Sequence, residues 1–579
     1  MNRMRGMWWA LRANPGLAAI LSLGLAWGFF MHSPGWTQSS VYAQVRALAS
    51  GTTEIDRWQW ETGDKAWVDG HFYSVKAPGL ATLTLPAYLG LDAIGAKGLA
   101  QDAATMAHRS SWDGWRVHHE APFESYGFSR ARARQVEVKA ANTTPIVWAL
   151  TLLGVVLPAV GLLLTVRWIA ERIEPGYGAA AAITLGVGTI VMTFAAEYFD
   201  HIASAALGFA AFALLFSERE GSPRLALVAA AGLLAGLAIC FEYPLGLLGI
   251  VLFGYALARG PRLRRGVAYG AAAVAGAAPA LLYNLWSLGS PLRFAYSDAV
   301  AVPGRSGHAI LGLNSAGFFG ITTPRPGAAV DLLLSGRGLL ALTPVLVMGL
   351  VGAAVMRRSG RRAEAWVIFA VAAVFFLYNS AYWQPLGGGT PGPRFLIPAL
   401  PFLAVGLAPA FRHFRAMTLA LAIASGTMMV AGALTYPLVS GDGIAPWVQR
   451  LVWGDLEHTV LTPLGVTDPW LAIIPVLAAL SAAMAFAASA TPRAPVGAIR
   501  PAMLALLAWG LASIVTPSIA GDSEPPLGGG AATLGLVAAA GCASALTLLL
   551  VRHLERRAGA ASELRAPLGR AVEVGDRVS

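Results

Sequence analysis

Long uncharged apolar segments are the feature that most restricts the fold of this chain. The segment 148–166, WALTLLGVVLPAVGLLLTV, contains no charged residue. About 20 apolar residues in a helix cross a hydrocarbon core of about 30 Å, and the helix satisfies its own backbone polar groups. Similar segments recur along the 579 residues, of which 56% are hydrophobic and 13% are charged. The sequence therefore predicts a polytopic membrane protein.

We expect an all-α fold with about fourteen transmembrane helices. The first series of apolar segments covers 16–31, 145–168, 177–196, 201–217, 223–241, 243–259 and 265–286. The second series covers 338–356, 364–382, 395–411, 416–436, 469–489, 501–518 and 531–551. The segment 16–31 follows a basic start but has no small-x-small cleavage site, which favours an uncleaved first helix over a signal peptide.

The positions of the arginines orient this map. With the amino terminus inside, the short inner loops collect fourteen arginines, as cytoplasmic loops do. These arginines are Arg167, Arg172, Arg219, Arg224, Arg259, Arg262, Arg264, Arg265, Arg357, Arg358, Arg361, Arg362, Arg412 and Arg415. The map predicts that both termini lie in the cytoplasm. It also accounts for the net charge of +11 without nucleic-acid binding.

A large outer loop, 32–144, follows the first helix. It contains all four lysines of the chain, Lys65, Lys76, Lys97 and Lys139. Within it, 79–95 is expected to be an interfacial or re-entrant helix, because the segment is short, contains Pro86 and ends near Asp92, and 39–49 a companion helix. Ser39 or Ser40 is the expected cap of the first. The polar stretch 97–143 is predicted to be a mobile solvated excursion, and 326–334 a third interfacial helix.

Ionisable residues on the outer side predict a pocket, because charged groups in or beside membrane spans are costly. They are Lys76, the EYFDH stretch at 197–201 with His201, Glu242, Arg337 and Arg394. The glycine-rich loop before Arg394 lets backbone amides approach an anion, and the guanidinium can fork onto phosphate. The simpler alternative is an arginine that snorkels at a helix end. His201 could likewise bind a phosphate or cap a helix.

Five carboxylates precede Lys76 in the outer loop: Glu54, Asp56, Glu61, Asp64 and Asp69. A carboxylate can act as the base that deprotonates an acceptor hydroxyl in glycosyl chemistry. Asp69-Gly70 also fits a simple turn. Asp56 and Asp64 have no such explanation and are the stronger candidates.

The motifs resemble those of the polyprenyl-phosphate-dependent membrane glycosyltransferases of the GT-C type, which include the aminoarabinose transferases of lipid A and the protein O-mannosyltransferases. Tyr73 and Lys76 in YSVKAPG are similar to the family's Y-x-x-K-P motif. NLWSLGSP (284–291), SGRGLLALTP (335–344) and GGGTPGPRFLIPALPFL (387–403) resemble elements of a large bacterial branch. The resemblance covers roughly residues 15–410.

The resemblance implies a lipid-linked sugar donor, an envelope lipid, glycan or protein acceptor, and an active site on the outer face. Two positions depart from the family pattern: Gln38 stands where the catalytic aspartate is expected, and Val75 where an acidic residue precedes the lysine. We therefore expect the base to be Asp64 first and Asp56 second. The expected substrate-binding residues are Tyr73, Lys76, Asp69, His201, Arg337 and Arg394. Family members differ in metal use, so a divalent metal is possible, but no metal-ligand spacing stands out.

The chain is expected to divide into a catalytic module (1–410), additional C-terminal transmembrane helices (411–552) and a cytoplasmic tail (553–579). Two other functions remain open. A transporter or lipid flippase would place ionisable residues near the middle of the membrane, where few are found. A catalytically inactive envelope-assembly scaffold would be consistent with Gln38 and Val75.

Overall fold

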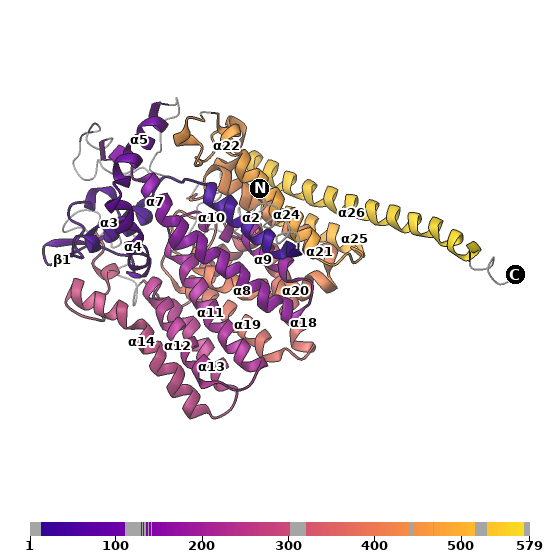
Figure 1. Ribbon diagram of the computed structural model, residues 1–579, viewed down its shortest axis with the longest axis horizontal. Coiled ribbons are helices and arrows are strands. Elements are labelled where there is room, and N and C mark those ends of the chain that lie inside the picture. The colour runs from indigo at the N-terminus through magenta and orange to yellow at the C-terminus, as the bar shows by residue number, and fades with distance from the viewer. Residues whose placement is uncertain are drawn as a thin grey trace.

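The computed structural model describes residues 13–109, 142–300, 320–439, 444–466, 468–515 and 530–572, together with 129, 131, 135, 136, 138 and 139. Most of the predicted polar excursion at 97–143 lies outside these residues. Helices dominate the described chain and confirm the all-α polytopic prediction (Figure 1). Within the described residues, seven helices are long and apolar enough to cross a membrane, or nine if two bent pairs each count as one span.

In the first half of the chain, α2 is followed by the outer-loop helices α3, α4 and α5 and then by the helices of the bundle. The bounds are α2 Pro15–Phe29, α3 Trp36–Ala49, α4 Gly79–Ala93, α5 Ala96–Arg109, α7 Thr144–Thr151, a π-helical turn η3 Leu152–Val156, α8 Leu157–Ile173, α9 Gly178–Val187, α10 Val191–Phe194, α11 Asp200–Glu220, α12 Leu225–Phe241, α13 Leu245–Leu257 and α14 Arg262–Leu288. Short 3-10 turns are η1 Gln59–Glu61 and η4 Ala295–Asp298.

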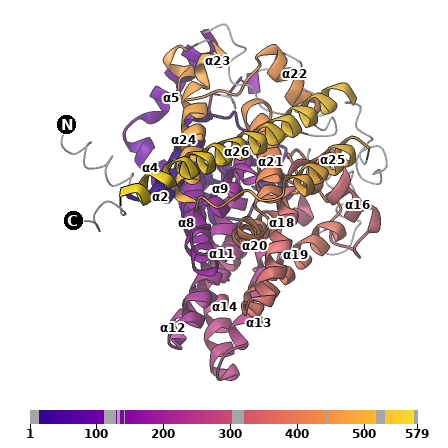
Figure 2. The same cartoon turned by 90° about the vertical axis from the view of Figure 1, so that its right-hand side faces the viewer.

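The second half continues the bundle and then extends away from it. The bounds are α16 Pro326–Leu334, α17 Leu339–Leu342, α18 Val345–Arg358, α19 Arg362–Ala381, η6 Arg394–Ala399, α20 Leu400–His413, α21 Arg415–Thr435, α22 Ala445–Trp453, η7 Thr462–Leu464, α23 Pro469–Ala472, α24 Ile474–Ala490, α25 Ile499–Val515 and α26 Gly530–Val572. Figure 2 shows α26 crossing the bundle obliquely, in front of α21 and α24.

Each of the fourteen predicted segments overlaps a helix, but the count of fourteen spans stays a prediction. Six of the apolar helices have only 10 to 17 residues. The segment 177–196 is one such case, because the chain breaks into α9 and α10 around Gly188. The predicted helix at 338–356 begins with α17 and bends by 87° before α18. Length of an apolar run alone does not reveal such breaks.

The helices predicted at 39–49 and 79–95 in the outer loop, and at 326–334 in a later loop, are present as α3, α4 and α16, with one correction. Their interfacial position stays a prediction. The cap of α3 is not Ser39 or Ser40: the helix begins three residues earlier, and the Gln38 side chain accepts a hydrogen bond from Gly35 N. α3, α4, α5 and the hairpin gather at one end of the bundle (Figure 1).

A two-stranded antiparallel hairpin within the outer loop was not predicted. β1 Lys65–Val68 pairs with β2 His71–Ser74, with Lys65 opposite Ser74 and Val68 opposite His71. The turn at Asp69-Gly70 is confirmed: both residues have positive φ, at 50° and 97°, as a two-residue hairpin turn requires. Because β2 leads directly to α4, the hairpin fixes where Lys76 emerges.

Ion pairs connect the arginine-rich loops at the end of the bundle opposite the hairpin. Arg361 pairs with Glu220 at 2.7 Å, and Arg172 lies 3.7 Å from the same glutamate. Arg412 pairs with Glu174. Loops that the sequence assigns to one side of the membrane therefore lie together, and the hairpin and α3 lie at the other end.

Candidate functional site

A cavity of about 690 Å³ lies at the end of the bundle where the outer loop packs. Five charged or ionisable side chains line its polar part: Lys76, Asp200, His201, Glu242 and Arg394. Its other wall is apolar and comes from α12, α13, α14 and α19, through residues such as Ile250, Leu281 and Leu377. Ile250 and Leu377 are 69% and 52% exposed. The apolar wall is therefore accessible to a ligand.

Lys76 is held at the cavity by contacts with the outer loop. It follows β2, and its backbone N–H donates to Ser74 Oγ at 3.1 Å. Its Nζ lies 2.7 Å from Asp64 Oδ2 and 3.4 Å from the Tyr296 hydroxyl. Burial is the largest influence and lowers the pKa of the Lys76 amine, but the Asp64 carboxylate and the Tyr296 hydroxyl together outweigh burial, so the pKa is raised. Lys76 is therefore a buried, protonated cation.

Asp64 accepts bonds from two residues that line the cavity. Thr37 Oγ1 donates to Asp64 Oδ2 at 2.7 Å, and Lys76 Nζ contacts the same oxygen. Ser40 Oγ donates to the Asp64 carbonyl at 2.6 Å and so fixes the backbone to α3. The carboxylate lies just before β1 and is 18% exposed. The structure thus brings the predicted base and the predicted phosphate-binding lysine into direct contact.

Arg394 enters the cavity from the glycine-rich loop. Gly387 has φ of 88°, and a Cβ there would lie 2.8 Å from Arg394 Nε, so the absent side chain makes room for the guanidinium. The guanidinium lies 5.6 Å from the Phe199 ring and 5.2 Å from the Phe395 ring. Among the described residues no carboxylate forms an ion pair with it, and its buried Nε has no hydrogen-bond acceptor. Arg394 is therefore available to an anion.

His201 and Asp200 begin α11 on the cavity wall. His201 contacts Glu242, which follows α12, and its ring stacks on Phe199. Asp200 is buried, and its Oδ1 has no hydrogen-bond partner among the described residues. The predicted candidate His201 thus reaches the cavity, together with two carboxylates.

Five predicted site residues do not line this cavity: Asp64, which contacts two lining residues, and Arg337, Tyr73, Asp69 and Asp56. Arg337 donates from Nη1 to the carbonyls of Gly388 (2.7 Å), Thr390 (3.2 Å) and Val439 (2.9 Å), so it ties the glycine-rich loop to the segment that follows α21. The Tyr73 side chain is 8% exposed within the hairpin. Asp69 is exposed in the hairpin turn, 3.7 Å from Arg293.

Asp56, the second candidate for the base, also lies away from the cavity. Its Oδ1 accepts from Phe72 N at 2.6 Å, and its Oδ2 lies 2.8 Å from His71 Nδ1. Of the two predicted bases, only Asp64 contacts residues that line the cavity.

Gln38, at the position expected for the family's aspartate, joins a buried polar cluster. Its Nε2 donates to Glu197 Oε2 at 2.7 Å. His32 Nδ1 lies 3.2 Å from Glu457 and 3.8 Å from Glu197. Sequence reasoning missed His32, Glu457 and also Tyr296. They come from three distant segments, and no local motif marks them.

Comparisons with known proteins gave structural similarities only. No family model and no curated protein matches the chain. ArnT from Cupriavidus metallidurans, in a crystal structure bound to undecaprenyl phosphate, is 16% identical over 92% of this chain and 84% of that chain, with a TM-score of 0.43. The oligosaccharyltransferase of Archaeoglobus fulgidus is 12% identical over 83% and 56% of the two chains, with a TM-score of 0.40.

Proposed function

We propose that this protein is a membrane glycosyltransferase that moves a sugar from a polyprenyl-phosphate donor to an envelope lipid, glycan or protein. The observation that carries this proposal is that Lys76 and Arg394 line one cavity with an apolar wall. These residues are far apart in the sequence, so the fold brings them together. A buried lysine and a half-buried arginine beside an apolar surface match a lipid phosphate, whose head is anionic and whose tail is apolar.

The apolar wall supports entry of a lipid from the side. α13, α14 and α19 contribute to the wall, and the most apolar window of α14 has only 17% of its residues buried. A prenyl chain lying between these helices would replace lipid contacts with protein contacts. Its phosphate would then reach Lys76 and Arg394, because charge-assisted hydrogen bonds to phosphate are the strong ones.

Asp64 is placed to act as the base. In the proposed step the acceptor oxygen attacks the anomeric carbon, and the bond from that carbon to the phosphate oxygen breaks. The electron pair stays on the phosphate oxygen, where Lys76 and Arg394 stabilise the developing charge. The acceptor proton passes to the Asp64 carboxylate. Arrival of the donor phosphate would draw Lys76 away from Asp64 and release the carboxylate for this role.

The proposed side of action is the outer face of a bacterial plasma membrane, with both termini in the cytoplasm. The paired arginine loops support this orientation, because they lie at the end opposite the hairpin and because cytoplasmic loops collect Lys and Arg. Asp64 and Lys76 then face outward, where a lipid-linked donor rather than a nucleotide sugar is available.

Deletion and complementation would test the proposal. Cells lacking the protein would be complemented with the wild type, with Asp64→Asn, or with Asp92→Asn as a control. Asp92 is an exposed outer-loop carboxylate that pairs with Lys97. Mass spectrometry of membrane lipids and envelope glycans should show one glycosylated product lost on deletion and restored by the wild type and Asp92→Asn only. Equal restoration by Asp64→Asn would overturn the assigned base and favour an inactive scaffold. An unchanged profile after deletion would overturn the transferase.

A further inference from the structure

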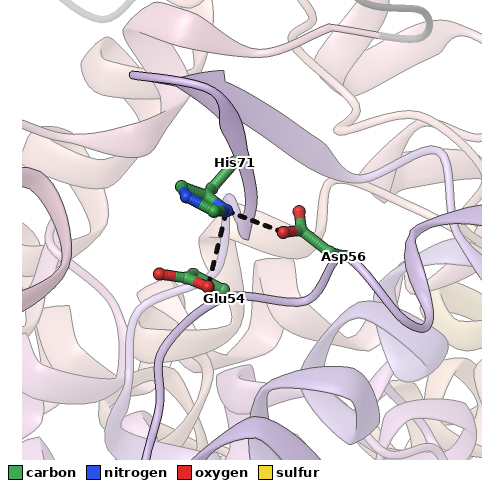
Figure 3. A group of neighbouring side chains, drawn as sticks. All are labelled: Glu54, Asp56 and His71. Atoms are coloured by element: carbon green, nitrogen blue, oxygen red, sulfur yellow. Dashed lines mark hydrogen bonds and ion pairs between the residues drawn. The ribbon is translucent and has the colours of Figure 1, made fainter.

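Three potential metal ligands meet on the outer hairpin, outside the cavity. Glu54, Asp56 and His71 each point one ligand atom toward a common centre, as Figure 3 shows. The three atoms lie within 4.8 Å of one another. His71 Nδ1 is 2.8 Å from Asp56 Oδ2 and 3.4 Å from Glu54 Oε2. None of the three residues lines the cavity described above.

The backbone holds these side chains on one face. Ile55 N donates to Phe72 O at 2.7 Å, and Glu54 forms a β-bridge with Tyr73, so the segment before Asp56 runs antiparallel to β2. Alternate residues of a strand point to the same face, which places Glu54 and Asp56 together. His71 is then the cross-strand neighbour of Asp56 and the diagonal neighbour of Glu54.

The spacing of the ligand atoms suits a small divalent transition metal. Zinc binds imidazole and carboxylate at about 2.0–2.1 Å, so two ligand atoms of a tetrahedral site lie about 3.3 Å apart. The His71–Glu54 distance of 3.4 Å already has this length, and the His71–Asp56 distance of 2.8 Å must open by roughly half an ångström. All three side chains are at least partly exposed, so an ion and a water can reach them.

The charge of the cluster also favours a cation. Among the described residues, neither Glu54 nor Asp56 forms an ion pair with a lysine or arginine, and one imidazole faces both carboxylates. Calcium and magnesium prefer sites made of oxygen ligands alone, whereas imidazole with carboxylates suits zinc and its neighbours in the first transition row.

We propose that Glu54, Asp56 and His71 form a binding site for one divalent transition metal, with zinc as the reference ion and water in the fourth position. The bound ion would link the segment 54–56 to the start of β2. Because the other end of β2 leads to Lys76, the ion would stiffen the outer loop on which Lys76 is carried. The ion would take no part in sugar transfer, so the site is independent of the function proposed above.

Zinc binding by the full-length protein in detergent tests this inference. The protein is stripped with a chelator, titrated with zinc by calorimetry, desalted, and analysed for metal by elemental mass spectrometry. The variants are Glu54→Gln, Asp56→Asn and His71→Ala. Asp69→Asn, in the turn of the same hairpin, is the control. In Asp56→Asn the amide oxygen can still accept a hydrogen bond from Phe72 N, so we expect this variant to fold. It therefore remains a decisive test even if His71→Ala fails to fold.

The wild type and Asp69→Asn should retain one more zinc per chain than the three ligand variants. The affinity of that zinc should be at least tenfold weaker in Asp56→Asn, and zinc should raise the melting temperature of the wild type and of Asp69→Asn but not of the three ligand variants. Cobalt bound in place of zinc should show the visible absorption of a four-coordinate site. Equal zinc content in wild type and Asp56→Asn, or no zinc retained by the wild type, would overturn the inference.

Discussion

At the scale of the residue, the contact between Lys76 and Asp64 links the proposed phosphate-binding cation to the proposed base. Lys76 is buried, and burial lowers the pKa of its amine. The contact with Asp64 is the main effect that raises this pKa, so the pair stabilises the charge of the lysine. In the proposed mechanism an incoming phosphate would compete with Asp64 for the same ammonium. Binding of an anionic donor and activation of the base would thereby be coupled through one lysine.

Loss of either cation should weaken phosphate binding. A hydrogen bond to a charged group contributes about 1.5–3 kcal/mol, which corresponds to roughly tenfold to hundredfold in affinity. We expect Lys76→Met and Arg394→Met to weaken binding of farnesyl phosphate by that factor, measured by titration of purified protein in detergent. Lys97→Met is the matched control, because Lys97 is exposed and pairs with Asp92. Farnesol, which lacks the phosphate, should bind all four proteins alike. An unchanged affinity in both cavity variants would contradict the phosphate site.

Lys65 gives the hairpin a measurable dependence on pH. This side chain is completely buried under Trp60 and Phe72, and burial lowers its pKa to about 7 from 10.5. Between these two values the unfolded chain binds more protons than the folded one, so stability rises with pH, by at most about 1.4 kcal/mol per unit.

Substitution of Lys65 by Met should remove that rise. We expect the melting temperature of the wild type to gain more than that of Lys65→Met between pH 7 and pH 9.5, in the same detergent. Lys97→Met, which changes an exposed lysine, should follow the wild type. Parallel curves for wild type and Lys65→Met would show that the buried lysine keeps its proton over this range.

At the scale of the element, close helix contacts build the wall of the cavity. Gly276 of α14 packs against α12, and a Cβ there would overlap the Leu233 carbonyl oxygen and lie 2.9 Å from Leu237 N. Small residues at such crossings let membrane helices approach closely. The same helix carries Gly270, around which a Cβ would meet nothing within 4 Å.

These two glycines form a matched pair for a stability test. Gly276→Ala should destabilise the protein by about 1–3 kcal/mol, because the extra methyl forces α12 and α14 apart. Gly270→Ala should be neutral or slightly stabilising, because alanine favours a helix by about 1 kcal/mol over glycine. The melting temperatures of the two variants in detergent provide the measurement. Equal melting temperatures would mean that the two helices separate without cost.

Elements with a local signal were predicted well from the sequence. Pro78 and Gly79 mark the start of α4, and 326–334 coincides with α16. The hairpin was missed because the polar stretch 65–74 has neither a long apolar run nor a clean alternation, and its pairing is fixed by the Asp69-Gly70 turn and by burial of Lys65 and Phe72. Breaks such as Gly188 were missed because both halves of the run are equally apolar.

In the candidate site too, residues marked by a local motif were predicted, whereas contacts that depend on tertiary packing were not. Lys76 and Arg394 could be found because a motif and a glycine-rich loop mark them locally. The preference for Asp64 over Asp56 could only be a ranking, since both lie in the same acidic segment and the bond between Asp64 and Lys76 depends on how the hairpin folds back. His32 and Glu457 are 425 positions apart in the sequence, and only tertiary packing brings them into contact.

At the scale of the whole molecule, the C-terminal third is joined to the outer end of the first helix. Met31 N donates to His458 O at 2.9 Å, Val460 N donates to Phe29 O at 3.0 Å, and α24 packs beside α2. The His32–Glu457 contact is buried within this joint. The division into a module at 1–410 and added helices at 411–552 stays a prediction, but these contacts tie the two parts together beside the cavity.

Protonation of His32 should make this joint sensitive to pH. Burial disfavours the imidazolium, but Glu197 and Glu457 together outweigh burial and raise the pKa of His32 above 6.5. Since the folded pKa is the higher one, the resulting stability is complete below pH 6.5 and is lost as the pH rises through the folded value, by at most about 1.4 kcal/mol per unit. Glu457→Gln removes one of the two charges, so its melting temperature should fall less than that of the wild type between pH 6 and pH 8.5. Asp455→Asn, which changes an exposed partner of Arg450 in the same segment, should behave like the wild type. If Glu457→Gln and the wild type lose stability equally over this range, the C-terminal third is not held to the first helix by a charged His32.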